Sequence, residues 1–207
     1  MIHVIDHGTG NLASISNFLD NAKVNHQLAS NPKDLKNSSH IIIPGVGHFQ
    51  AAMQRLRDHQ MDQAIIDTVT MGVPILGICL GMQILYEFSE EGMSQGLGLM
   101  KGKVVKKIPV NTDQFKVPNV GWHNVDCISS SPLFNNLEAD ELEFYFANSF
   151  AVENINYKNT TSTYHFDIDY IASAEKDNIY CTQFHPEKSG RAGHVLMSNF
   201  LNIAKDK

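Results

Sequence analysis

Apolar residues in the first half of the chain form short continuous runs that alternate with stripes at helical spacing. The runs cover residues 2–5, 41–43 and 73–78. The fully apolar run at 41–43 is typical of a strand buried on both faces of a parallel sheet. Between the runs, residues 11–23 and 49–69 carry apolar positions every three or four residues, which predicts helices. This alternation predicts right-handed crossovers and a parallel sheet covered by helices.

The pattern changes in the second half, where strands follow one another with few helices between them. A helix is expected at 80–88 and a glycine-rich loop at 91–102, and a last helix is expected at 192–203. Some of the later strands should pair in antiparallel fashion. The chain shows no internal repeat or linker, so a single domain over 1–207 is expected. The later strands are expected at 104–105, 120–125, 144–146, 168–174 and 179–184.

The composition of the chain argues against several classes of function. The chain has 207 residues, of which 43% are hydrophobic and 18% charged, an ordinary globular balance. The net charge of −6 and the lack of a long basic run argue against nucleic-acid binding. The longest apolar stretch is too short and too interrupted by glycine to span a membrane. Three scattered cysteines and an N-terminus without a signal-peptide pattern predict a cytoplasmic protein with reduced thiols.

Cys79 lies between two glycines, directly after the third apolar run. This pattern predicts a nucleophile elbow, a sharp strand-to-helix turn that strains the central residue and presents its side chain. At the start of the following helix, the helix dipole and free N–H groups favour the thiolate. A buried structural cysteine is the alternative, because Cys is among the most buried residue types.

A second segment, about a hundred residues further on, supplies a base and a carboxylate. Pro186 ends the predicted strand at 179–184. His185 and Glu187 are two positions apart, so in an extended chain their side chains point the same way. The imidazole can then take the thiol proton while the carboxylate orients the ring. A solvated His and Glu at a strand end is the alternative, but the Cys79 elbow favours a Cys-His-Glu triad.

The segments 77–83 and 183–189 resemble the two signatures of class I (triad) glutamine amidotransferases. The loop 44–49 has the form Pro-Gly-Val-Gly where many members have Pro-Gly-Gly. This form is similar to the glutaminase subunits of imidazole glycerol phosphate synthase, which act in histidine biosynthesis. The resemblance runs over nearly the whole chain and implies a flavodoxin-like α/β fold, an open, mainly parallel sheet with helices on both faces. Further family blocks are matched at 6–11, 117–122 and 145–150.

The resemblance implies a glutaminase that hydrolyses L-glutamine to glutamate and ammonia through a thioester on Cys79. His185 protonates the departing ammonia and then activates water. The Leu80 N–H and the Val46 N–H are expected to form the oxyanion hole, which in this subtype is completed when the partner enzyme is loaded. Gln83 lies one turn after Cys79 and is expected to hold the substrate rather than to be a plain surface residue. The expected substrate-binding residues are Gly45, Val46, Gly47, Leu80, Gln83, Ser149 and Phe150.

A partner is expected because free ammonia is protonated in bulk water and loses its nucleophilicity. The chain has no room for a synthase domain, so the acceptor chemistry belongs to another polypeptide. The resemblance identifies it as a (β/α)₈ cyclase subunit that makes imidazole glycerol phosphate and AICAR, in a heterodimer. Asn11, Trp122 and Lys188 fall in blocks that face this partner. A lone Trp suits an interface anchor, and a core position is the alternative for it.

Two other kinds of site are rejected on spacing. Residues 8–13 resemble a dinucleotide-binding fingerprint, but the acidic residue expected after the second strand is missing, since Asn31-Pro32-Lys33 occupies that region. The ten histidines include no His-Glu-x-x-His pattern and no close Cys/His cluster. Neither a cofactor nor a metal is therefore expected.

Three positions depart from the family pattern. The family usually has Pro-His-x-Gly-Trp-Asn, where this chain has Asn119 and His123, and a His where it has Asn148. These positions lie outside the triad, so the expected glutaminase chemistry stands, but they leave the ammonia acceptor open. A paralogous subunit that feeds amidino-sugar synthesis for surface polysaccharides is the leading alternative. A Cys protease or hydrolase on a similar elbow fold, or an idle binding subunit, fits the loop, Gln83 and the triad less well.

Overall fold

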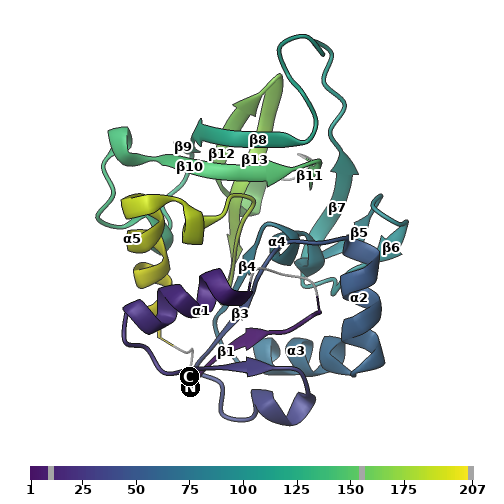
Figure 1. Cartoon of the computed structure of the whole chain (residues 1–207), viewed down its shortest axis with the longest axis vertical. Helices are drawn as coiled ribbons and strands as arrows, with labels where there is room; N and C mark the ends of the chain where they lie inside the picture. The colour runs from purple at the N-terminus through teal and green to yellow at the C-terminus, as the bar shows by residue number, and fades with distance from the viewer. Residues whose placement is uncertain (9–11, 154–156, 205–207) are drawn as a thin grey trace.

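The computed structural model describes residues 1–8, 12–153 and 157–204. An eight-stranded sheet forms its centre, with the order β2-β1-β3-β4-β14-β13-β12-β9 (Figure 1). Its first five strands are parallel and its last three are antiparallel. In sheet order the strands are β2 (His26–Ala29), β1 (Ile2–Ile5), β3 (His40–Ile43), β4 (Ile75–Ile78), β14 (Ile179–Thr182), β13 (Ile168–Lys176), β12 (Thr160–Phe166) and β9 (Asp126–Cys127).

Helices cover both faces of the parallel part, as predicted. Successive residues of β3 point to opposite faces, so Ile41 and Ile43 enter one core and Ile42 the other. The first core is closed by α2 (Phe49–Asp58) and α3 (Met61–Thr70), and the second by α1 (Leu12–Asn21) and α5 (Gly190–Leu201). The other helices of the described residues are α4 (Leu80–Leu85) and the 3₁₀ helices Pro32–Leu35, Pro132–Phe134, Ala139–Glu141, Tyr157–Asn159 and Pro186–Lys188.

Two smaller sheets flank the central one. A four-stranded sheet has the order β11-β7-β5-β6, and an antiparallel ribbon pairs β10 with β8. The ribbon lies across β12 and β13 in Figure 1, on the side of the molecule that also carries α1 and α5. The strands are β5 (Tyr86–Ser89), β6 (Ser94–Gln95), β7 (Met100–Lys106), β8 (Asn119–Asn124), β10 (Glu143–Asn148) and β11 (Phe150–Val152).

Several expected elements have different bounds or a different kind. The helix expected at 80–88 ends at Leu85, because Tyr86 begins a strand that pairs with β7. The stripe at 49–69 is two helices, separated where Gln60 takes a left-handed φ of 57°. The expected loop 91–102 contains β6 and the start of β7. The short or polar strands β2, β9, β11 and β12 were not predicted at all.

None of the helices in the described parts of the chain is long and apolar enough to cross a membrane. This agrees with the absence of a long apolar stretch in the sequence.

Candidate active site

Cys79 is the residue between β4 and α4, and its backbone is strained. Its φ of 51° and ψ of −104° lie outside the ordinary regions for a side-chain-bearing residue. The flanking glycines are required by close packing, since a Cβ on Gly77 would meet the Gly81 carbonyl and one on Gly81 would meet the Ile43 carbonyl. The Cys79 N–H donates to Thr182 O at 2.7 Å, which joins the elbow to the end of β14. The predicted elbow is therefore present.

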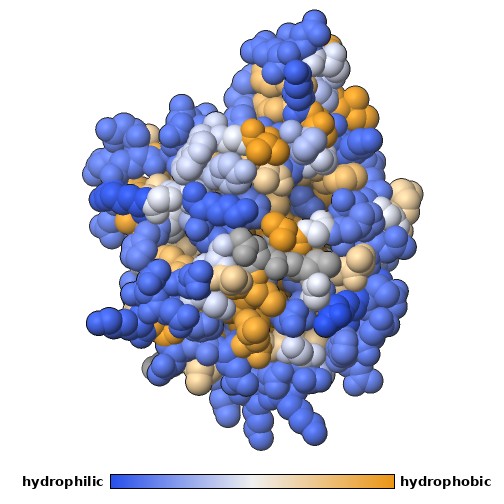
Figure 2. All heavy atoms as spheres, in the orientation of Figure 1, coloured by the Kyte–Doolittle hydropathy of each residue, from blue (hydrophilic) through white to orange (hydrophobic). Residues whose placement is uncertain are grey.

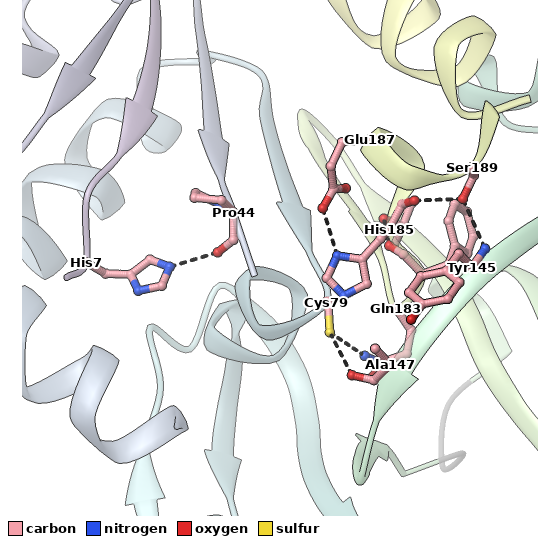
Figure 3. A network of polar contacts seen from close by, with 11 residues as sticks. His7, Pro44, Cys79, Tyr145, Ala147, Gln183, His185, Glu187 and Ser189 are labelled. Atoms are coloured by element: carbon pink, nitrogen blue, oxygen red, sulfur yellow. Dashed lines mark hydrogen bonds and ion pairs between the residues drawn. The ribbon is translucent and has the colours of Figure 1, made fainter. Parts of the chain in front are cut away.

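His185 and Glu187 follow the end of β14 and contact each other. His185 Nδ1 lies 2.8 Å from Glu187 Oε1, and the two side chains are 0% and 3% exposed (Figure 3). The expected geometry was wrong in detail: β14 ends at Thr182, and Pro186 begins a 3₁₀ helix, so the two residues do not share an extended strand. The contact arises from the tight turn at Pro186.

The main chain of His185 is fixed to the β8–β10 ribbon. Its N–H donates to Tyr145 O at 2.8 Å. The Ser189 hydroxyl donates to His185 O at 2.6 Å and accepts the Tyr145 N–H at 3.0 Å (Figure 3). Because Tyr145 belongs to β10, the position of the imidazole depends on how the ribbon is seated.

The ring of His185 lies beside the sulfur of Cys79 (Figure 3). Its Nε2 atom is buried and has no hydrogen-bond partner within the described residues, so it is available for proton transfer. Burial alone lowers the pKa of His185, but the negative charges of a Cys79 thiolate and of Glu187 outweigh it and raise that pKa to about 10. The site therefore favours the protonated, imidazolium form of His185.

Gln183 is a site residue that the sequence did not single out. Its side chain is fully buried, and Nε2 donates to Cys79 Sγ at 3.5 Å. Its Oε1 accepts from Gln83 Nε2 at 3.1 Å, and Gln83 also donates to Phe150 O at 3.0 Å. Gln83 is thus a buried residue, 4% exposed, and not part of the helix surface. The sequence feature that could have identified Gln183 is its place as a polar residue two positions before His185, within the same segment.

A cavity of about 190 Å³ opens over Cys79. All seven residues predicted to bind substrate line it, together with Cys79 itself. A larger cavity of about 800 Å³ shares no lining residue with it and contains none of the predicted site residues. The smaller cavity is the one that fits the chemistry. Its lining is Gly45, Val46, Gly47, Cys79, Leu80, Gln83, Glu91, Pro118, Ala147, Asn148, Ser149 and Phe150.

The loop 44–47 packs directly on the elbow. A Cβ on Gly45 would collide with Ile78 O and Leu80 N, so only glycine lets the loop approach this closely. His7 holds its start, because Nε2 donates to Pro44 O at 2.8 Å (Figure 3). Burial lowers the pKa of His7, which favours the neutral ring. The loop is therefore anchored at the cavity, which Gly45, Val46 and Gly47 line.

The residues expected at the partner interface have different outcomes. Trp122 is 50% exposed on β8, which excludes the core alternative. It lies opposite Tyr145 in the ribbon, with ring centroids 6.0 Å apart, and Lys188 Nζ is 5.7 Å from the Tyr145 ring centroid. In the view of Figure 2, apolar side chains are exposed in the middle of the molecule, between hydrophilic flanks. Asn11 lies outside the described residues.

No group of three or more His, Cys, Asp or Glu side chains in the described ranges could hold a metal ion. The rejected dinucleotide fingerprint at 8–13 lies partly outside those ranges.

The elbow cysteine at the cavity, with an imidazole and its carboxylate beside the sulfur, is the arrangement expected of an enzyme that works through a covalent thioester. The sequence profile of the glutamine amidotransferase class-I family matches residues 3–204, and the chain belongs to this family.

Relatives that align with this chain over nearly their full length share the name of one enzyme subunit. The chain is 40% identical over 210 residues to the imidazole glycerol phosphate synthase subunit HisH of Geobacillus sp. (strain WCH70), with 100% of this chain and 99% of the relative covered. It is 38% identical to the same subunit of Bacillus subtilis (strain 168), with 100% and 98% covered. Among solved structures, PurLQS from Thermotoga maritima matches with a TM-score of 0.75 and 20% identity over 97% of each chain, a likeness of fold.

Proposed function

We propose that the chain is the glutaminase subunit of an imidazole glycerol phosphate synthase, acting in histidine biosynthesis in the cytoplasm. The observation that carries the chemistry is that Cys79 lines the same cavity as all the expected substrate residues, while the paired His185 and Glu187 lie beside its sulfur. The full-length relatives that bear the synthase name favour this acceptor pathway over polysaccharide amidino sugars.

The reaction follows from the positions of these groups. The Cys79 thiolate attacks the side-chain amide carbon of glutamine, and the oxyanion that forms accepts hydrogen bonds from the Leu80 and Val46 N–H groups. The His185 imidazolium protonates the amide nitrogen, the C–N bond breaks, and ammonia leaves behind a glutamyl thioester. His185 then takes a proton from water as the water attacks the thioester, and glutamate is released. Glu187 keeps the ring oriented through both steps.

A partner subunit receives the ammonia. Trp122 and the partly buried Tyr145 lie on the ribbon that fixes His185, and the exposed Lys188 lies in the 3₁₀ helix that follows His185, so docking on this cluster is coupled to the base. A half-exposed Trp with a neighbouring Tyr and Lys has the composition of an interface hot spot. We assign this surface to a (β/α)₈ cyclase subunit, with Asn11 assigned to it on the family pattern alone.

Reconstitution with a histidine-pathway cyclase subunit tests the pathway. The account expects a stable one-to-one complex in which glutamine hydrolysis is stimulated by the acceptor nucleotide and imidazole glycerol phosphate accumulates. A parallel reconstitution with an amidino-sugar amidotransferase is the control. Stimulation by that partner, with no complex formed by the cyclase, would overturn the pathway while leaving the glutaminase chemistry in place.

A further inference from the structure

A lysine is buried behind the cavity, between the β8–β10 ribbon and the central sheet. Lys107 is 2% exposed, and its Nζ atom lies 2.9 Å from the Tyr164 hydroxyl. The Phe166 and Tyr170 ring centroids are 3.7 and 4.6 Å from Nζ. Within the described residues this amine pairs with no carboxylate, and burial is the one cause acting on its pKa. Lysine is almost never buried without a partner charge, so this burial is unusual. We call the aromatic side chains of Tyr164, Phe166 and Tyr170 the cage of Lys107.

The cage is connected to the glutamine cavity by hydrogen bonds. The Tyr164 hydroxyl accepts from Asn148 Nδ2 at 3.3 Å, and Asn148 Nδ2 also donates to Phe150 O at 2.9 Å. In addition, the main-chain N–H of Lys107 donates to Ser149 O at 2.9 Å. Asn148, Ser149 and Phe150 all line the cavity. Lys107 therefore holds this wall at two points, once through its backbone and once through Tyr164.

The three departures from the family pattern belong to the same connected group. Asn119 lies directly opposite Asn148 in the ribbon, and its Nδ2 donates to Asn148 Oδ1 at 3.4 Å. His123 Nε2 lies 2.8 Å from Asn119 Oδ1. The three side chains therefore form one connected group, and that group ends at Asn148 in the cavity wall.

We propose that Lys107 is a positioning residue for the glutamine-binding segment 147–150 and that it acts through Tyr164 and Asn148. It touches neither the reacting atoms nor the substrate. Its part is to fix the direction in which Asn148, and with it the Ser149 and Phe150 main chain, faces the cavity. This rests on the proposed assignment of that segment to glutamine binding.

The protonation state of Lys107 decides which hydrogen bonds the Tyr164 hydroxyl can make to Lys107 and Asn148. Lys107 and Asn148 both hydrogen-bond the Tyr164 hydroxyl, and the Asn119 side chain acts on it as well. A neutral amine accepts the Tyr164 proton and leaves the hydroxyl oxygen to accept from Asn148. An ammonium has no lone pair, so it competes with Asn148 for the oxygen and leaves the Tyr164 proton without an acceptor.

Burial brings the titration of the amine to neutral pH, while the aromatic rings around Nζ favour the ammonium. Burial lowers the pKa of Lys107 to about 7. The titratable groups that face it are Tyr164 on β12, Tyr170 on β13 and His123 on β8. Burial raises the pKa of both tyrosines and lowers that of His123, so each is neutral at this pH. Asp167, the charged group acting on Tyr170, accepts the Val110 N–H instead. We therefore expect glutamine binding to weaken as the pH falls through 7.

The test compares Lys107→Met and Tyr164→Phe with Lys106→Met, an exposed neighbour on β7, in the assembled enzyme. For the wild type and the Lys106→Met control, the glutamine KM should rise about 3- to 10-fold as the pH falls below 7. In both cage variants, KM should stay at the raised value across this range, while kcat changes by less than about 2-fold. Below pH 7 the melting temperature of Lys107→Met should not fall, because the charge that the wild type buries at that pH has been removed.

A wild-type KM and an unchanged inflection near pH 7 in Lys107→Met would overturn the proposal. If that variant does not fold, Tyr164→Phe decides, and a wild-type KM profile there overturns it as well. Loss of glutamine turnover in the Lys106→Met control would also count against it. If glutamine turnover does not depend on Cys79, the proposed active site is wrong. That result is distinct from the failure of the role proposed for Lys107.

Discussion

At the scale of single residues, the sulfur of Cys79 is approached by a base on one side and an amide donor on another. His185 supplies the charge, and Gln183 supplies a hydrogen bond whose direction is set by Gln83. A hydrogen bond to a charged acceptor contributes about 1.5–3 kcal/mol, roughly twice a neutral one. Gln183 is thus expected to stabilise the thiolate before substrate arrives.

Replacing Gln183 with Met removes this donor while keeping the volume of the side chain. We expect the rate of Cys79 alkylation by iodoacetamide at neutral pH to fall about 10-fold, in line with the loss of one charge-assisted hydrogen bond. The measurement is mass-spectrometric labelling against time, with exposed Cys127 as the internal control. An unchanged rate at Cys79 would show that Gln183 only fills space.

Lys107 has a second consequence, for stability. Its pKa falls from 10.5 in the unfolded chain to about 7 in the folded one, so folding releases a proton between these values. The free energy of unfolding of the wild type should therefore rise with pH across this window. Below pH 7 the full cost of the buried charge applies, on the order of 2–5 kcal/mol.

The variant Lys107→Met should accordingly be more stable than the wild type below pH 7, and its advantage should shrink as the pH rises toward 10.5. Urea denaturation at about pH 6 and about pH 9 measures both points. An advantage that does not change between these two pH values would mean that the amine stays charged inside its cage.

At the scale of elements, the β8–β10 ribbon joins the exposed face to the catalytic base. Its outer side carries Trp122, its inner side carries Asn119 and Asn148, and the Tyr145 main chain holds His185. A partner seated on Trp122 can therefore shift both the base and the glutamine wall. This gives a physical route by which docking controls hydrolysis.

Trp122→Ala should weaken binding of the cyclase subunit about 10- to 100-fold, the usual effect of removing an interface Trp. The glutaminase activity of the isolated chain should change little, because Trp122 does not line the cavity. Isothermal titration with the cyclase measures the affinity, and Met71→Ala, an exposed apolar residue at the end of α3, is the matched control. Equal affinities for the two variants would place the interface elsewhere.

At the scale of the whole molecule, the features that could be predicted from the sequence are those encoded in the spacing of neighbouring residues. The elbow at 77–81 and the segment around His185 carry their chemistry in a few consecutive residues, and the apolar runs give the parallel sheet. Strand β12 was missed because its Thr and Ser residues, buried here, read as polar. The end of α4 was missed because pairing of Tyr86 with β7 overrides helical spacing.

Tertiary placement also explains the site residues that were missed. Nothing in the sequence distinguishes Lys107 from Lys106, yet one is buried in a cage and the other is exposed. Gln183 and His7 act on Cys79 and on the loop across distances of 104 and 37 positions along the chain. Contacts of this range are visible once the sheet has brought the strand ends together.

The most direct test of the central claim is the nitrogen source used by the assembled complex of a Cys79→Ala variant. The account predicts that glutamine-dependent product formation is abolished, while product formation from added ammonium salt stays at the wild-type rate. This outcome would place the hydrolysis on Cys79 and the acceptor chemistry on the partner. Glutamine-dependent turnover that survives the substitution would contradict the account, because the thioester could then not be formed on this sulfur.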